Sequence, residues 1–307
     1  MEADPAALPS EKDLHRLLRE RMALLKRLMQ TRPLNSYSGP VLLSPQAAGL
    51  FFHEVIGHRL EGSRLLSPDD GSTFRDLRGR QIAPSFIDII DDPTPRKFAD
   101  RTLTGHFAYD DEGNPSRRVV LVEKGILRSF LTSASPIPGQ KSINGHARAE
   151  EHERPISRMG NLFIQNRNPV PEDQLREIFL EEIRRQNKPF GIYVKECLGG
   201  ETETSSYDFQ AFKGEILRAS RVYPDGQEED IYGVDFVGTP LSSLENIMAM
   251  GGQCEVDNSY CGAESGMIPV STIAPAALMQ TMELQGKERG KLTQYSMPLP
   301  YAAVGKR

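Results

Sequence analysis

The chain of 307 residues has no tryptophan and only three cysteines, Cys197, Cys254 and Cys261. An odd and small number of cysteines in a chain of this length argues against a disulfide framework and predicts a reducing compartment, the cytoplasm. A lone cysteine in such a protein is most often a small buried apolar residue. Each thiol therefore gains a functional meaning only from partner groups near it.

The sequence also lacks a long apolar run and an excess of basic residues. No stretch approaches the roughly 20 apolar residues that span a bilayer, and the start, "MEADPAALPSEKD", has no apolar core of a secretory signal. The net charge is −5, from 37 basic and 42 acidic residues, which gives no global support for nucleic-acid binding. With 38% hydrophobic and 26% charged residues, we expect a folded protein without a membrane or nucleic-acid partner.

The chain divides into a helix with a linker over residues 1–40 and a larger domain over residues 41–307. Residues 10–32 are predicted to be helical, because Ser10 can cap the helix and apolar residues recur at helical spacing. This helix is expected to dock on the domain, and its basic polar face leaves a membrane-surface helix as the alternative. The segment "RPLNSYSGP" is predicted to be a linker. The apolar stripe consists of Leu14, Leu17, Leu18, Leu25, Leu28 and Met29.

Runs of strand-like segments follow, with helices placed irregularly among them. The segments "SFIDIIDD", "RRVVLVEKGILRSFL" and "GIYVKECLGG" are rich in β-branched residues, and Lys124-Gly125 marks a turn inside the second. Helices are predicted near residues 171–187 and 241–250, and residues 134–160 are predicted to form a long loop. This order favours the α+β class, an antiparallel-β-rich domain, over a βαβ array.

One segment, "SPQAAGLFFHEVIGHRLEG", is predicted to be a helix that carries two histidines and a glutamate close together. Ser44 is a capping residue and Pro45 suits the first helical position. The helix is apolar around most of its circumference, so it should be buried. His53, Glu54 and His58 then need partners, because an unpaired buried charge is costly.

The spacing of the two histidines leaves two interpretations open. Residues five apart point about 140° apart on a regular α-helix, which does not bring two nitrogens to one ion. A local π-bulge would do so, and Gly57 is the residue that would permit it. The alternative is two histidines that are satisfied in the core. A shared metal therefore predicts a departure from regular helical hydrogen bonding near Gly57.

A later segment, "NSYCGAESGMIPVS", supplies a further candidate ligand. Its glycines place Cys261 on a tight turn that leads into an apolar strand. Two nitrogens and one thiolate would leave a fourth zinc position open, as catalytic sites do. Taken alone, Cys261 would most often be a core cysteine.

Several motifs together resemble the TldD/PmbA metallopeptidases. "HEVIGHRLEG" resembles their His-Glu-x-x-x-His signature, and "YCGAESGMIPVS" resembles their late Cys-Gly turn and the apolar strand after it. Three segments between these, in the family's order, also match: "AYDDEGNPSRRVVLVEKGILRSFL", "ISRMGN" and "LGGETETSSYDF". The resemblance covers roughly residues 41–285.

The resemblance implies a zinc peptidase of the motif-bearing TldD type that acts on peptides and loosely folded chains. It implies one zinc ion held by His53, His58 and Cys261, with Glu54 as the general base. It further implies that Arg158 and Asn161 contact the substrate backbone, and that the partner is a second copy or a paralogous subunit. The other function class left open is a non-catalytic zinc-containing partner or peptide-binding subunit of such a complex.

The chain departs from the family pattern in three places, one of which is the segment "MELQGKERGK", which stands where the family has a Gly-rich end after the final apolar strand. The family usually has an N-terminal α/β domain before the metal helix, and this chain is expected to lack it, either as a short homologue or as a fragment. Cys254 lies seven residues before Cys261 and could compete as a ligand. Cys261 is preferred because Gly262 follows it, as in the family turn.

Overall fold

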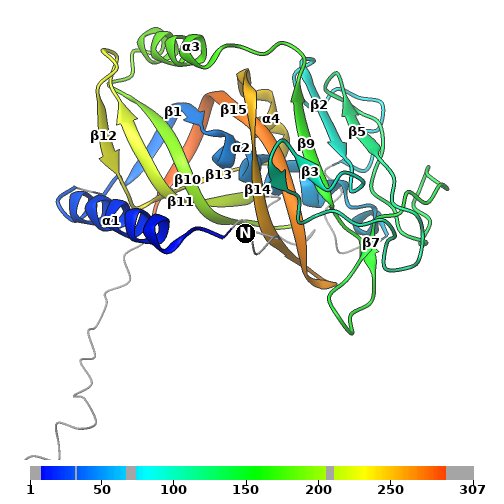
Figure 1. Ribbon diagram of the computed structural model, residues 1–307. Helices are drawn as coiled ribbons and strands as arrows, with labels where there is room; N and C mark the ends of the chain where they lie inside the picture. The colour runs from blue at the N-terminus through cyan, green and yellow to red at the C-terminus, as the bar shows by residue number, and fades with distance from the viewer. Residues whose placement is uncertain (1–7, 32, 67–73, 205–210, 288–307) are drawn as a thin grey trace, which may run out of the picture.

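The protein has an α+β fold built on a large, mainly antiparallel sheet, as predicted (Figure 1). The computed structural model describes residues 8–31, 33–66, 74–204 and 211–287. Part of the "LGGETETSSYDF" segment and the end of the chain lie outside these residues. The strands of the large sheet are β1 (Ser36–Leu43), β2 (Ile87–Asp91), β5 (Val119–Glu123), β6 (Ile126–Leu127), β9 (Asn161–Asn166), β10 (Gly191–Thr202), β11 (Phe212–Val222), β12 (Glu228–Ile231), β13 (Val234–Gly238), β14 (Ile247–Ala263) and β15 (Gly266–Gly286).

Part of this sheet closes on itself and part of it extends as an open wing. Strands β1, β10, β11, β13 and β15 pair in a closed ring, because β15 also pairs with β1. The wing continues from β15 through β9, β2, β5 and β6. The β1–β10 and β15–β9 pairs are parallel and the others are antiparallel. Two separate short hairpins consist of β3 (Lys97–Phe98) with β4 (Arg101–Thr102), and β7 (Ala147–Arg148) with β8 (Ile156–Ser157).

In the residues that the structure describes, four α-helices accompany the sheet, and one of them continues into irregular helical turns. The helices are α1 (Glu11–Leu28), α2 (Pro45–Phe52), α3 (Glu172–Arg185) and α4 (Pro240–Glu245). Helix α2 passes directly into a π-helical turn, His53–Gly57, and then a 3-10 turn, His58–Leu60; a further 3-10 turn covers Gly62–Leu65. The Ser44 hydroxyl accepts the Ala47 N–H at 3.2 Å, and Pro45 begins the helix, which confirms the predicted start.

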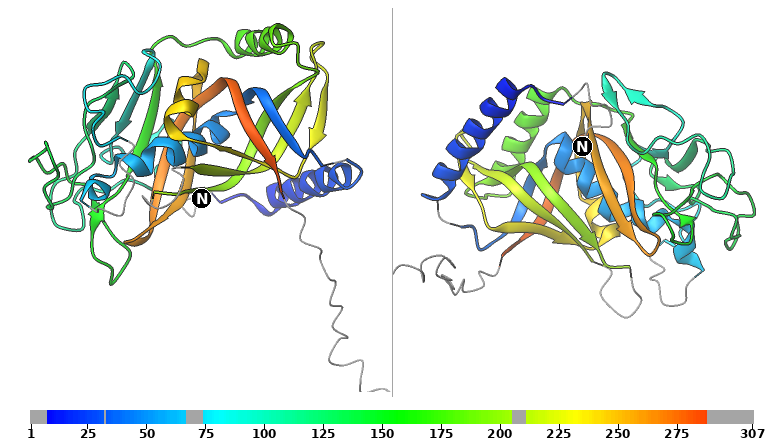
Figure 2. Two further views of the ribbon diagram at one scale, coloured as in Figure 1. Left: turned by 180° about the vertical axis from the view of Figure 1, so that it is seen from behind. Right: turned by 60° about the horizontal axis from the view of Figure 1, so that its bottom comes forward.

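Helix α2 is buried, as its apolar sequence predicted. It packs against β10, β14 and β15 (Figure 2). Phe51 is 0% exposed and makes edge-to-face contacts with Phe212 of β11 and Phe236 of β13, at ring-centroid distances of 5.7 and 6.4 Å. The turn that follows α2 is therefore held firmly by the main core.

Helix α3 packs on the sheet through a second apolar cluster. Leu175, Phe179 and Ile183 of the helix are buried against Leu42 of β1 and Leu278 of β15. The predicted helix over 171–187 is confirmed, with one apolar face at helical spacing.

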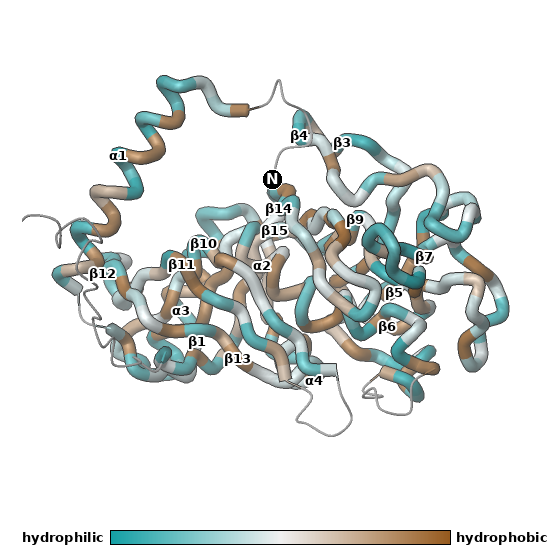
Figure 3. Tube along the Cα trace, turned by 90° about the horizontal axis from the view of Figure 1, so that it is seen from below, coloured by the Kyte–Doolittle hydropathy of each residue, from teal (hydrophilic) through white to brown (hydrophobic). Residues whose placement is uncertain are grey.

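Helix α1 is present and capped by Ser10 as predicted, but its apolar stripe does not form the docking face. Leu24 is buried, and the ion pairs Arg21–Glu196 and Arg27–Asp230 attach the helix to β10 and β12. Figure 3 shows hydrophobic and hydrophilic residues alternating along α1. Only Leu17 and Leu28 of the predicted stripe are half-buried, on the side of Leu24, and the rest of the stripe is exposed. Leu14, Leu18, Leu25 and Met29 are 49%, 59%, 59% and 77% exposed.

Three further segments differ from the sequence-based expectation. Strand β1 begins at Ser36, inside the predicted linker, where it pairs with β15. The helix expected near 241–250 ends at Glu245, because β14 starts at Ile247. Cys261 lies within β14, paired with Ile268, rather than on the tight turn. No described helix is long and apolar enough to cross a membrane.

Candidate metal centre

The two histidines face one another because the helix widens between them. The His58 N–H bonds to the His53 carbonyl, an i to i−5 contact that defines a π-turn. This turn brings residues five apart onto the same face, so the imidazole rings lie 4.9 Å apart and nearly perpendicular. The predicted departure from regular helical bonding near Gly57 is confirmed.

Gly57 serves the turn through its lack of a side chain rather than through an unusual backbone angle. Its φ is −54°, which any residue adopts. A Cβ at this position would lie 2.2 Å from Met159 Sδ, and Met159 is itself buried. The glycine thus lets the segment before β9 press against the π-turn.

Replacing Gly57 with alanine should therefore destabilise the protein by about 1–3 kcal/mol, the usual cost of overpacking a core. Gly49→Ala on α2 is the matched control, because its Cβ would meet Thr272 at 3.6 Å, an ordinary contact. Chemical denaturation of both variants checks this. Equal stability of the two variants would contradict the packing account of Gly57.

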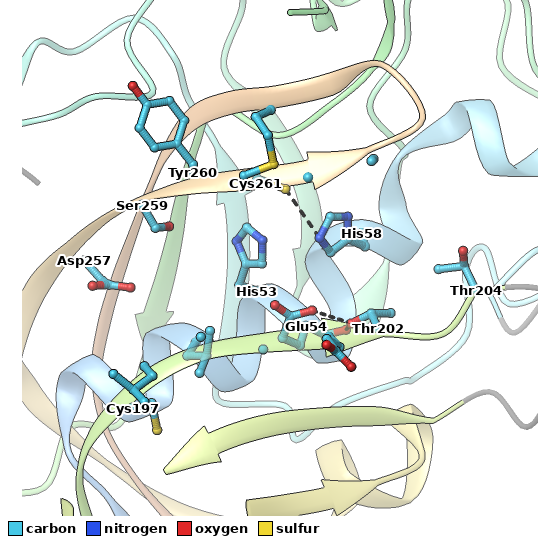
Figure 4. Close-up of a pocket in the computed structure, with 18 of the residues that line it drawn as sticks. His53, Glu54, His58, Cys197, Thr202, Thr204, Asp257, Ser259, Tyr260 and Cys261 are labelled. Atoms are coloured by element: carbon cyan, nitrogen blue, oxygen red, sulfur yellow. Dashed lines mark hydrogen bonds between the residues drawn. The ribbon is translucent and has the colours of Figure 1, made fainter. Parts of the chain in front are cut away.

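Cys261 completes a cluster with the two histidines. The ligand atoms of His53, His58 and Cys261 all lie within 4.8 Å of one another, and all three residues are buried. Cys261 Sγ is 3.4 Å from His58 Nε2 (Figure 4). Among the residues that the structure describes, no other group of His, Cys, Asp and Glu has this arrangement. Cys254 is outside the cluster.

The charges within the cluster suit a metal with nitrogen and sulfur ligands. Burial raises the pKa of the Cys261 thiol, but His58 and His53 outweigh burial and lower it to about 5. Burial also lowers the pKa of His58, yet the facing thiolate and Glu61 hold it well above its usual value. The histidines thus favour the thiolate form of Cys261, which is the form that binds a metal, and two imidazoles with one thiolate fit zinc.

Glu54 lies beside the candidate ligands, and its carboxyl group is hydrogen-bonded to strand β10. It is 5% exposed, and Thr202 Oγ1 of β10 donates to Glu54 Oε2 at 2.5 Å (Figure 4). The same hydroxyl lies 2.7 Å from the Glu54 carbonyl oxygen. A Cβ at Gly200 would lie 2.6 Å from Glu54 Cγ, so the β10 backbone closes against this side chain. The sequence does not predict the contact between Thr202 and Glu54, although the "LGGETET" segment belongs to the family resemblance.

A cavity of about 650 Å³ opens in front of this cluster. His53, Glu54, His58 and Cys261 all line it, between residues 197–202 of β10 and residues 257–263 of β14. Within the described part of the chain, β15 is the strand that pairs with β14, and Gly251 of β14 also forms an isolated bridge to Val170; residues 257–263, which line the cavity, pair with β15 and with no other strand. The ligands and the carboxylate therefore share one open space with extended backbone on both walls.

Arg158 and Asn161, the residues expected to bind substrate, lie away from that space. Both are 0% exposed and neither lines the cavity. Asn161 Nδ2 donates to the carbonyl oxygens of Asp92 and Pro95. The guanidinium of Arg158 donates hydrogen bonds to the carbonyl oxygen and the sulfur of Cys261.

A second layer of charged residues surrounds His58. Glu61 is fully buried, and its Oε2 lies 3.3 Å from His58 Nδ1 and accepts from Arg64 Nη2 at 3.1 Å. Burial raises the pKa of Glu61, but His58, Arg64 and Arg158 lower it to about 2. The ionised carboxylate orients the His58 ring so that Nε2 faces Cys261.

The sequence of the chain is similar to that of a known protein family. The sequence model of the PmbA/TldA metallopeptidase C-terminal domain matches residues 36–286. The chain is 32% identical over 243 residues to a protein of Archaeoglobus fulgidus named "Metalloprotease", covering 78% of this chain and 51% of that protein. It is 28% identical over 270 residues to the "Zinc metalloprotease TldD homolog" of Saccharolobus solfataricus, covering 84% and 56%.

Solved structures show the same fold. The crystal structure of TldE from Thermococcus kodakarensis superposes with a TM-score of 0.63 at 18% identity, covering 89% of this chain and 56% of that one. At this identity the likeness shows the fold alone. The chain spans about half the length of the curated relatives that it matches.

Proposed function

Because the chain belongs to the PmbA/TldA metallopeptidase C-terminal domain family, we propose that it is a zinc-dependent peptidase that hydrolyses peptide bonds in unfolded or extended peptides. The observation that carries this proposal is the convergence of His53, His58, Cys261 and Glu54 on one cavity. Two nitrogens and one sulfur leave a fourth zinc position for water or substrate, as in catalytic rather than structural sites.

Each side chain has a defined task in this proposal. His53, His58 and Cys261 would hold the ion, which would supply Lewis-acid polarisation of the scissile carbonyl and a lowered pKa for water. Glu54 takes the proton of the attacking water and passes it to the leaving amine. Thr202 orients the Glu54 carboxyl through the 2.5 Å hydrogen bond.

The walls of the cavity favour an extended substrate. Backbone of β10 and β14 flanks the site, and an unpaired strand edge can accept an extended peptide through main-chain hydrogen bonds. In a folded protein most of the backbone is already paired within the fold and cannot bind in this way. We therefore propose peptides and unfolded chains as the substrate class.

Zinc-loaded protein should cleave the reduced and alkylated form of a small disulfide-bonded protein and leave its native form intact. The two substrates have the same sequence, so the comparison isolates chain extension. Cleavage is measured by mass spectrometry, with the protein alone and mixed with a paralogous chain, because a second subunit, another copy or a paralogue, is the partner that we propose.

Failure to cleave either form in both assays would contradict the peptidase proposal. Zinc-loaded protein that binds the unfolded chain without cleaving it would support the other function class, a non-catalytic zinc-containing partner or peptide-binding subunit. Equal cleavage of the native form would contradict the substrate class.

A further inference from the structure

Arg158 is a fully buried cation that sits directly behind the metal cluster. It follows β8 and is 0% exposed. Its Nη2 donates to the Cys261 carbonyl oxygen at 2.7 Å and lies 3.2 Å from Cys261 Sγ. On its other side, Nε donates to Glu61 Oε1 at 3.2 Å. A buried guanidinium needs such partners, because a charge without them is costly to bury.

The hydrogen-bonding capacity of this guanidinium is used up within the protein. Besides the contacts to Cys261 and Glu61, Nη1 donates to Ser265 Oγ at 2.9 Å and to the Gly266 carbonyl oxygen at 3.1 Å. A guanidinium has five N–H donors, and these five contacts match them. No donor remains for a substrate, so a role in substrate binding does not fit this geometry.

The contacts of Arg158 reach two metal ligands that are far apart in the chain. One arm touches the sulfur of Cys261, and the other holds Glu61, whose second oxygen lies 3.3 Å from His58 Nδ1. His58 and Cys261 are separated by 203 residues. The planar guanidinium of Arg158 therefore lies between the sulfur of Cys261 and the Glu61 carboxylate that contacts His58.

We propose that Arg158 is a positioning residue of the metal centre, which fixes the Cys261 sulfur directly and the His58 imidazole through Glu61. An N–H donated to a thiolate also draws electron density from the sulfur, so the arginine tunes how strongly Cys261 donates to a bound metal. Lysine could supply the charge but not the planar fork that reaches both partners. This inference rests on the proposed zinc site and not on peptide hydrolysis.

The test compares metal binding by the parent, Arg158→Lys and the control Arg148→Lys. Arg148 is a buried neighbour that donates to the Met159 carbonyl oxygen and lies over the Phe107 ring, without a hydrogen bond to the cluster. Zinc affinity is measured by competition with a chromophoric chelator. The thiolate-to-metal absorption band is recorded with Co²⁺ in place of zinc.

Arg158→Lys should bind zinc about 10–100-fold more weakly, the usual effect of losing an outer contact to a ligand, and should shift the Co²⁺ band. Arg148→Lys should match the parent in both measurements. Ser265→Ala removes a single anchor of Arg158 without leaving a buried charge unpaired, and should weaken zinc binding and shift the band in the same direction, to a smaller extent. If Arg158→Lys does not fold, Ser265→Ala still tests the proposal.

Unchanged zinc affinity and band position in both Arg158→Lys and Ser265→Ala would overturn the proposal, as would an equal loss in Arg148→Lys. If the parent binds no zinc, the proposal falls together with the metal centre. If the parent binds zinc but cleaves no peptide, the proposed function fails while the role of Arg158 is still decided by these measurements.

Discussion

Replacing Glu54 with glutamine is expected to lower the rate of peptide hydrolysis by roughly 100-fold or more, the usual contribution of general acid–base catalysis. Glutamine has nearly the same shape and can keep a hydrogen bond to Thr202, whose hydroxyl lies 2.5 Å from the Glu54 carboxyl. It cannot accept the proton of water. Zinc content should stay at the level of the parent, because Glu54 is not part of the cluster of ligand atoms.

The control for this variant is Glu181→Gln, which removes the same charge from the exposed face of α3, outside the cavity. Its kcat and KM should equal those of the parent. The measurement is steady-state hydrolysis of an extended peptide by zinc-loaded proteins of equal metal content. Parent-like turnover by Glu54→Gln would remove Glu54 from the mechanism even if the metal site is correct.

Loss of any one ligand should abolish tight zinc binding. His53→Ala, His58→Ala and Cys261→Ala each leave two protein ligands, fewer than the three that catalytic zinc sites keep. We expect zinc to fall from about one per chain to near zero after dialysis, with loss of hydrolysis. Atomic emission spectroscopy of the dialysed proteins measures this.

Cys254→Ala is the control that distinguishes the two thiols of β14. Cys254 pairs with Pro275, and Cys261 pairs with Ile268, further along the same strand. Cys254→Ala should keep its zinc, and Cys261→Ala should lose it. The reverse result would mean that the ligand set is wrong, although a metal site exists.

Much of the local structure could be predicted because it depends on neighbours in sequence. Ser44 and Pro45 indicate the start of α2 through capping chemistry. Lys124 and Gly125 indicate the turn between β5 and β6, where both residues have positive φ. The five-residue spacing of His53 and His58 predicts a widened helix on the condition that both bind one metal ion, because a regular helix would point the two side chains about 140° apart.

The remainder depends on contacts between distant segments, which periodicity does not report. A side chain is excluded at Gly57 because Met159, about a hundred positions later in the chain, packs against it. The orientation of Glu54 depends on Thr202, and the placement of Arg158 depends on Glu61 and Cys261. The resemblance indicated that "ISRMGN" and "LGGETET" matter, but assigned Arg158 a contact that its burial does not support.

Helix α1 shows why an apolar stripe does not by itself fix a docking face. Its leucines recur at helical spacing, yet Leu24 and two ion pairs attach the helix. Leu14 and Leu18 face outward. The burial of a stripe depends on what lies opposite it in the fold, and the periodicity of the helix alone does not report that.

The central claim is that His53, His58 and Cys261 hold one zinc ion in front of Glu54. The most direct test is anomalous diffraction at the zinc absorption edge, on crystals of protein purified without added metal. The account predicts one strong peak per chain, about 2.0–2.3 Å from the two imidazole nitrogens and the sulfur, with a position open to the cavity. A zinc-free cluster, or a peak bound by Cys254 instead of Cys261, would contradict it.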